Sequence, residues 1–225
     1  MKKIGMIVAV EMSAVLTRYG TAKEVSVKHG FEVHTYEAES YTIYVVNAGV
    51  GELAAAAAAQ ELISVYGVEL IVNFGVVGGL TEEMAQTKTC IIEKLVHYDF
   101  DLAEIDNVPV GQYPGYESIY IPTTASLVER AVELVPDLKR VTCASADKFI
   151  GTTEKKRALH ERFGADICEM EAAGIVITCN RNNIPVLSIK TVSDGISGGA
   201  EDFFAEVRNS SLICLDITDK IIREL

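Results

Sequence analysis

The sequence predicts a three-layer α/β sandwich, a fold in which helices flank a central β-sheet on both faces. Segments typical of strands alternate with segments typical of helices along most of the 225 residues. Several strand segments are continuous apolar runs, which are typical of strands buried on both faces. No linker-like stretch interrupts the chain, so we expect residues 1–225 to form a single domain.

The N-terminal part begins with a predicted central strand, because residues 4–10 form an unbroken apolar run. We expect a short helix next, which Ser13 caps with its hydroxyl group and which Gly20 ends. Residues 31–37 and 41–47 are rich in β-branched and aromatic side chains. They predict two strands joined as a hairpin.

The next predicted helix covers residues 52–66, since Ala54–Ala59 has high helix propensity and Gly67 can end it. Residues 70–74 are expected to form a buried strand. A glycine-rich turn at 75–80 follows, where the backbone passes close to a ligand or to a packing partner. This segment does not match the GxGxxG pattern of dinucleotide sites.

The second half of the chain continues the alternation. Predicted strands cover 89–96, 140–145 and 184–192, and predicted helices cover 124–134, 153–163, 170–180 and 203–223. Between them, residues 97–122 are rich in Asp, Gly, Tyr and Pro. Loops of this length in compact domains usually serve binding or assembly.

The composition favours a small-molecule partner. With 49% hydrophobic residues the chain can build a sizeable core, and 32 acidic residues against 20 Lys and Arg give a formal charge of -12. Such a surface repels phosphate backbones and anionic lipids. We therefore expect neither nucleic acid nor a membrane as a partner.

Cysteine usage and the N-terminus indicate a cytoplasmic protein. The five cysteines are scattered, odd in number and without CxxC spacing, so we expect reduced core thiols, no metal and no cofactor. The apolar run after Met1 is short and Glu11 interrupts it, unlike a signal peptide or a membrane helix.

Two acidic residues mark a candidate active site. Glu171 stands at the start of a predicted helix, and Asp194 follows the strand at 184–192. A carboxylate beside buried apolar segments is costly unless it has a partner or a task, and ligands usually bind at strand ends of α/β sheets. The structural alternatives are a helix cap for Asp194 and an ion pair for Glu171, and Lys190 is interpreted as an ion-pair partner.

Five groups of residues occur in the order and nearly with the spacing of one enzyme family. They are Lys3-Ile4-Gly5 with Ala9, Gly75 with Gly78-Gly79-Leu80, Asp99 to Asp101 with Gly111-Gln112 and Pro114-Gly115, Ser145 with Asp147 and Phe149-Ile150, and Glu169-Met170-Glu171 with Ser193-Asp194. Through them the whole chain resembles the bacterial 5'-methylthioadenosine/S-adenosylhomocysteine nucleosidases of the purine nucleoside phosphorylase superfamily. The resemblance implies a nucleoside phosphorylase/hydrolase-like sandwich with a mixed central sheet. It also implies a homodimer in which the long loop, with Pro114, reaches the neighbouring subunit's pocket.

The resemblance further implies hydrolysis of the bond between adenine N9 and ribose C1'. Asp194, beside Ser193, matches the acid that protonates N7 of the leaving purine. Glu171 matches the residue that grips the ribose hydroxyls, where its charge also stabilises an oxocarbenium-like sugar. Met170 would line the same sugar.

The remaining matches concern the base and the 5' group. Phe149 matches the ring that stacks on the purine, although an aromatic residue is also typical of a core. The backbone at Lys148 and Ile150 would read the purine edge. The resemblance assigns the apolar 5'-alkylthio pocket to Val50, Leu102, Ile105 and one of Phe203 or Phe204.

Two positions depart from the family pattern. Ser13 stands where the family carries the glutamate that activates water, and Val76 replaces a small polar residue of the glycine-rich segment. A serine hydroxyl is not a base near neutral pH without a partner, so Glu11, two residues upstream, becomes the candidate base.

Three hypotheses remain open on this basis. The first is a nucleosidase that uses Glu11 as its base. The second is a phosphorylase, which needs Arg or Lys donors for phosphate, but no Lys or Arg occurs between Lys28 and Lys88 and only Arg18 is near. The third is a protein that binds a nucleoside without cleaving it.

Overall fold

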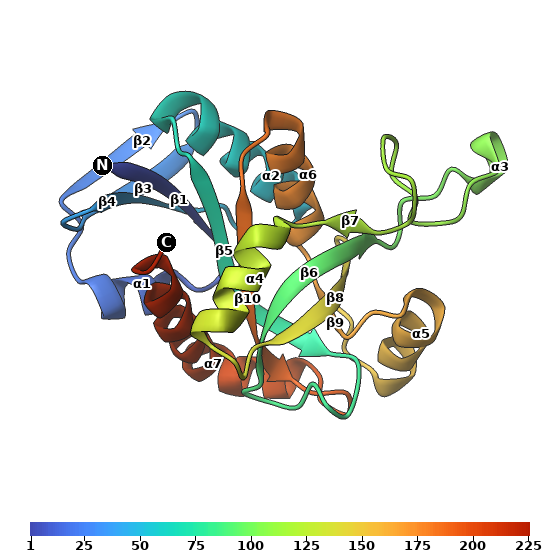
Figure 1. The fold of residues 1–225 in the computed structure, drawn as a ribbon. Helices are drawn as coiled ribbons and strands as arrows, with labels where there is room; N and C mark the ends of the chain where they lie inside the picture. The colour runs from blue at the N-terminus through green and yellow to red at the C-terminus, as the bar shows by residue number, and fades with distance from the viewer.

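The computed structural model describes all 225 residues as helices packed around one mixed β-sheet (Figure 1). The strands are β1 (Lys2–Val8), β2 (Glu24–Lys28), β3 (Phe31–Glu37), β4 (Tyr41–Asn47), β5 (Leu70–Gly79), β6 (Thr89–His97), β7 (Ile121–Pro122), β8 (Lys139–Ser145), β9 (Ile167–Glu169) and β10 (Val186–Asp194). The helices are α1 (Met12–Tyr19), α2 (Glu52–Glu61) with a π-helical turn η1 (Leu62–Tyr66), α3 (Ala103–Asp106), α4 (Ala125–Leu134), α5 (Thr153–Phe163), α6 (Ala172–Asn182) and α7 (Ala200–Ile222). None of these helices is long and apolar enough to cross a bilayer.

The sheet follows the order β10-β6-β8-β9-β5-β1-β4-β3-β2, and β10 also pairs with β5. Strands β5, β10, β6, β8 and β9 therefore form a closed ring in which each strand pairs with the next. Strands β1 to β4 extend the sheet from β5 and end at the open edge strand β2. Parallel pairs such as β1 with β5 occur beside antiparallel pairs such as β5 with β9. The mixed sheet expected from the sequence is thus confirmed.

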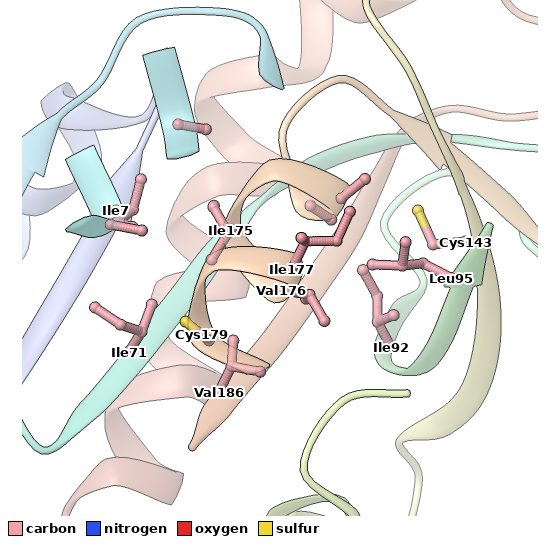
Figure 2. Close-up of a cluster of buried hydrophobic side chains, with 14 of the residues drawn as sticks. Ile7, Ile71, Ile92, Leu95, Cys143, Ile175, Val176, Ile177, Cys179 and Val186 are labelled. Atoms are coloured by element: carbon pink, nitrogen blue, oxygen red, sulfur yellow. The ribbon is translucent and has the colours of Figure 1, made fainter. Parts of the chain in front are cut away.

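Alternation along the strands creates the two helical layers. In β1, Ile7 packs in the cluster that holds α2 and α6, whereas its neighbours Met6 and Val8 pack in the cluster that holds α1, α4 and α7. Successive strand side chains point to opposite faces, so an all-apolar strand needs a cover on both. Figure 2 shows the first cluster, where Ile175, Val176 and Cys179 of α6 lie among side chains of β1, β5, β6, β8 and β10.

Several predicted elements agree closely with the structure. The predicted helix at 153–163 and the hairpin strands at 31–37 and 41–47 match α5, β3 and β4 residue for residue. Gly67 ends the helix that precedes it, with a φ of 64°. Strong periodicity and clear end signals make these segments predictable from local sequence.

The glycine-rich segment is a strand, so the predicted turn at 75–80 was wrong. Strand β5 continues through Gly79 because β10 pairs with it in parallel from Val186 to Asp194, and β9 pairs with Gly78 and Gly79 on the other side. The glycines allow these neighbours to approach closely. The edge strand β2 was missed: it is only five residues long, and the valines of its short alternating pattern, Val25 and Val27, are exposed rather than packed in the core. Helix α1 begins at Met12, with Glu11 rather than Ser13 at the N-cap position.

Candidate active site

A cavity of about 380 Å³ lies beside the ends of β1, β5, β9 and β10. Four carboxylates line it: Glu11, Glu169, Glu171 and Asp194. Glu11 follows β1, Glu171 precedes α6, and Asp194 is the last residue of β10. The fold therefore brings the two acids singled out in the sequence, and the candidate base, to one cavity.

Most of the residues predicted for the site line this cavity. They are Glu11, Val50, Val76, Lys148, Phe149, Ile150, Met170, Glu171, Ser193 and Asp194. Four others lie outside it in this chain. Ser13 is exposed on α1, and Leu102, Ile105 and Pro114 belong to the segment around α3, which projects away from the body in Figure 1. A single chain thus does not bring these four to its own cavity.

Asp194 is buried, and both of its carboxylate oxygens have partners. Ser193 Oγ lies 2.9 Å from Oδ1, and Lys156 Nζ donates to Oδ2 over 2.6 Å. Burial raises the pKa of Asp194 above its ordinary value, while the ammonium group of Lys156 and the Ser193 hydroxyl lower it. The raised pKa favours a carboxyl that can hold and then give away a proton.

Glu171 faces the cavity from the start of α6. Its Oε1 accepts a hydrogen bond from the backbone N–H of Gly51 at 2.9 Å. Burial and the nearby charge of Glu169 raise the pKa of Glu171 to about 7, against the opposing effect of Lys190. Near neutral pH this carboxyl is therefore poised between its charged and neutral forms.

Glu11 is 4% exposed and is held by three backbone N–H groups. Its Oε2 accepts from Ala9 and Val10, and its Oε1 accepts from Val76, each at 3.0 Å. Gly75 makes room for it, because a Cβ at that position would lie 2.7 Å from Oε1. The carboxylate is thus fixed at the cavity wall.

Lys190 lies fully inside the protein among these acids. Its Nζ is 3.5 Å from Glu169 Oε2. Burial alone disfavours an ammonium group, but Glu169, Glu171 and Glu11 outweigh it and raise the pKa of Lys190 above its ordinary value. The interpretation of Lys190 as an ion-pair partner agrees with this geometry.

A network of polar groups that the sequence analysis missed lies behind the cavity. Ser145 Oγ lies 2.7 Å from Glu52 Oε1 and 2.5 Å from Glu169 Oε1, and it accepts a hydrogen bond from the N–H of Ala173. Burial, followed by the charge of Glu169, raises the pKa of Glu52 to about 8. A protonated Glu52 can donate to Ser145, which then donates to Glu169. The signal available in the sequence was Glu52, an acidic residue two positions before the alanine block at 54–59.

We expect Glu52→Gln to make stability less dependent on pH. The raised pKa means that folded Glu52 holds its proton more tightly than in the unfolded chain, so its contribution to stability is complete at low pH and is lost as pH rises towards 8. At about 1.4 kcal/mol per pKa unit, this pH-dependent contribution to the free energy of unfolding is a few kcal/mol. Thermal melting between pH 6 and pH 9 should show a smaller fall in Tm for Glu52→Gln than for the wild type. The exposed substitution Glu24→Gln should leave the wild-type slope, and an equal slope for Glu52→Gln would contradict a proton shared in this network.

Aromatic rings form one wall of the cavity. Phe149 and Phe203 both line it and meet edge to face, with ring centroids 5.7 Å apart. Phe149 is 48% exposed, which does not fit an ordinary core residue. Of the two phenylalanines considered for the 5' pocket, Phe203 lies at the cavity and Phe204 is 74% exposed.

The cations near the cavity are mostly committed to carboxylates. Lys190 pairs with Glu169 and Lys156 pairs with Asp194. Arg18, the candidate phosphate donor, is bound to Asp216 and Asp219 of α7. Lys148, which lines the cavity, is paired with Asp99, so the arrangement does not favour the phosphorylase hypothesis.

Comparison with known proteins agrees with the site. The model of the phosphorylase superfamily matches residues 3–224. An aminodeoxyfutalosine nucleosidase of Campylobacter jejuni is 30% identical over 181 residues, which span 78% of each chain. A 5'-methylthioadenosine/S-adenosylhomocysteine nucleosidase of Shewanella denitrificans is 29% identical over 199 residues, 85% of this chain and 86% of the relative.

Solved structures give the same result. A futalosine hydrolase mutant of Helicobacter pylori superposes with a TM-score of 0.94 at 25% identity, and the match covers 100% of both chains. A 5'-methylthioadenosine/S-adenosylhomocysteine nucleosidase of Helicobacter pylori, in complex with a pyrrolidine compound that carries a 4-amino-pyrrolo[3,2-d]pyrimidine, has the same TM-score and identity over 100% and 99% of the two chains. The chain belongs to the phosphorylase superfamily, within which it is similar to aminodeoxyfutalosine nucleosidases and to 5'-methylthioadenosine/S-adenosylhomocysteine nucleosidases, and it is an N-glycosyl hydrolase.

Proposed function

We propose that this enzyme hydrolyses the N-glycosidic bond of 5'-methylthioadenosine, S-adenosylhomocysteine or both, releasing adenine and the thioribose product. The observation that carries the proposal is the position of Asp194 and Glu171 in the wall of one cavity. One nucleoside can therefore meet an acid at its base and a second carboxylate at its sugar.

Asp194 acts on the leaving group. Breaking the bond between N9 and C1' would leave a purine anion, and a proton placed on N7 removes that charge. Burial raises the pKa of this carboxyl, which favours the protonated form that an acid needs. Phe149 stacks on the purine, with Lys148 and Ile150 along its edge.

Glu171 acts on the sugar. As the bond to the purine lengthens, positive charge develops on the ribose ring, and a nearby carboxylate stabilises it more than it stabilises the ground state. The same carboxylate accepts hydrogen bonds from the ribose hydroxyls, while Met170 and Val50 line the sugar and the 5' group.

Glu11 acts on the attacking water. Three backbone N–H groups hold the carboxylate at the cavity wall, so it can orient a water and accept its proton. The position of Glu11 supports it as the base in place of Ser13, which lies outside the cavity.

A second substrate is favoured by the relatives. An aminodeoxyfutalosine nucleosidase is among the most similar proteins, with 30% identity over 78% of the chain. The apolar wall formed by Val50, Phe203 and Val76 accepts an apolar 5' substituent without selecting its exact structure.

Direct assay tests the proposed function. The purified protein is incubated with 5'-methylthioadenosine, S-adenosylhomocysteine, aminodeoxyfutalosine, adenosine and inosine, each with and without phosphate, and free base is measured. We expect adenine release from one or more of the first three substrates without phosphate. Release only with phosphate, or tight binding without release, would contradict hydrolysis.

Glu11→Gln is expected to lower kcat by at least about tenfold, because the amide cannot accept the proton of the attacking water. The substitution keeps the size of the side chain, but its single oxygen can accept either from Ala9 and Val10 or from Val76, so a melting curve must accompany the kinetics. Ser13→Glu is the matched comparison and should be neutral or activating. Full activity of Glu11→Gln would remove Glu11 as the base.

We also propose that the enzyme acts as a homodimer. The segment around α3 projects from the body in Figure 1, and Ile105 on it is 80% exposed. In a dimer, the second subunit would cover this apolar side chain. Leu102, Ile105 and Pro114 of one subunit would then lie at the 5' end of the other subunit's cavity.

A further inference from the structure

Lys156 is a fully buried lysine on the inward face of α5. It shares that face with Leu159 and Phe163, three and seven residues later, where an apolar side chain is expected. Burying an ammonium group is costly unless it is paired and hydrogen-bonded. Its partner therefore indicates why a lysine stands here.

The lysine is surrounded by oxygen atoms around the end of β10. Its Nζ lies 2.6 Å from Asp194 Oδ2, 2.7 Å from the carbonyl oxygen of Gly195, and 3.1 Å from those of Asp194 and Gly198. An ammonium group has three hydrogens to donate and cannot accept. All four neighbours are acceptors, so the site is built for the charged form.

The neighbouring strand β5 leaves space for the ion pair between Lys156 and Asp194. At Gly78 of β5, a Cβ would lie 3.3 Å from Asp194 Oδ2 and 3.0 Å from the thiol of Cys168. Any larger residue would therefore press on the carboxylate that Lys156 holds. Gly78, Cys168 and Asp194 all line the cavity, but Lys156 does not.

The two oxygens of Asp194 are not equivalent. Oδ2 is occupied by Lys156, whereas Oδ1 faces the hydroxyl of Ser193 at 2.9 Å. That hydroxyl has a second acceptor, the carbonyl oxygen of Val77 at 3.3 Å. When Ser193 donates to Val77, Oδ1 is free to carry a proton.

We propose that Lys156 is a positioning residue for proton transfer, which holds Oδ2 of Asp194 so that Oδ1 carries the proton and which stabilises the carboxylate left when that proton moves to the purine. The inference rests on the proposed function, in which Asp194 is the general acid. Lys156 itself touches neither substrate nor water.

The step balances without any further reactant. The O–H bond at Oδ1 breaks as an N–H bond forms at N7, and the electrons of the C1'–N9 bond remain on the purine. Asp194 becomes a carboxylate beside the Lys156 ammonium group. Water attacks C1' and gives one proton to Glu11; after product release, exchange with solvent removes that proton and returns one to Asp194 for the next cycle.

Other charges near Asp194 come from three elements. Lys156 of α5 lowers its pKa, and Asp202 at the start of α7 raises it. Cys168 of β9 remains a neutral thiol, because burial raises its pKa to about 12. Removing the Lys156 charge therefore takes away the main influence that lowers the pKa of Asp194 and leaves only the Ser193 hydroxyl to oppose burial and Asp202. The protonated form would then persist to higher pH but would be a weaker acid.

Two substrates separate a role in proton transfer from a role in folding. The first is 5'-methylthioadenosine, whose purine needs a proton to leave. The second is the 4-nitrophenyl glycoside of 5-methylthioribose, whose nitrophenolate leaves without one. Lys156→Met is expected to lower kcat at least about tenfold on the nucleoside and to change it little on the glycoside. The alkaline limb of the kcat profile for the nucleoside should move up by roughly one to three pH units.

Lys155→Met is the control, since Lys155 is the exposed neighbour on the same helix and should leave both rates unchanged. Lys156→Gln, which keeps two N–H donors without the charge, should behave like Lys156→Met. Equal losses on both substrates, an unmoved alkaline limb, or failure of both Lys156 variants to fold would overturn the inference in favour of a structural lysine. If the wild type releases no base from any nucleoside, the proposed function fails instead.

Discussion

Asp194→Asn is expected to lower kcat for 5'-methylthioadenosine by about 10²–10⁴, the range that general acid catalysis contributes. The amide keeps the shape of the side chain but cannot give up a proton to N7. Its amide oxygen can still accept from Lys156 and its amide N–H can donate to the hydroxyl of Ser193, so the cavity should keep its form. Steady-state kinetics of adenine release measures this loss.

The control for this prediction is again a substrate whose leaving group needs no proton. With the 4-nitrophenyl glycoside, which needs no proton, Asp194→Asn should keep most of its activity. Similar binding of a substrate analogue by wild type and variant would show that the cavity remains intact. A comparable loss on both substrates would mean that Asp194 supports the site rather than acting as its acid.

Glu171→Gln is expected to lower kcat/KM by on the order of 10²–10³, the size of effect seen when one preorganised electrostatic group is removed. The amide can still contact the ribose hydroxyls, but it cannot stabilise the positive charge on the sugar. The loss should therefore appear mainly in kcat, since that charge exists only in the transition state.

The same residue predicts the acid side of the pH profile. Glu171 must be charged to stabilise the sugar, and its pKa is raised to about 7 by burial and by Glu169. Activity of the wild type should therefore fall as pH drops through about 7, and it should fall at higher pH as Asp194 loses its proton. In Glu171→Gln the acid limb should disappear from the kcat/KM profile. An acid limb that persists unchanged would assign it to a group other than Glu171.

Local patterns decided which elements could be predicted. Helix α5 has a threonine cap, the apolar residues Leu159 and Phe163 on one face and a glycine at its end, so its first and last residues can be predicted from neighbouring positions. Strand β5 is different, because the glycines at 75, 78 and 79 have low strand propensity. Residues 75–79 form a strand only because β9 and β10 supply pairing partners from more than 80 positions away in the sequence. Long-range pairing overrides a local preference that favours a turn.

The residues of the candidate site also fall into those that local sequence could identify and those that it could not. Glu171 and Asp194 could be selected because a carboxylate beside apolar runs is unusual. Lys156 and Glu52 could not, since each looks like an ordinary surface residue of a helix until its neighbours are known. Lys156 meets Asp194 across 38 positions, and Glu52 meets Ser145 across 93.

The sequence by itself determined the α/β architecture, the two principal carboxylates and the absence of the usual glutamate at position 13. Those features depend on periodicity and residue type, which are properties of neighbouring positions. Only the tertiary structure decided that Glu11 lies against Val76 at the cavity, that Lys156 is bound to Asp194, and that Leu102, Ile105 and Pro114 lie away from this chain's own cavity. The free energy of a buried charge depends on which partners surround it, and the fold brings those partners from distant parts of the chain.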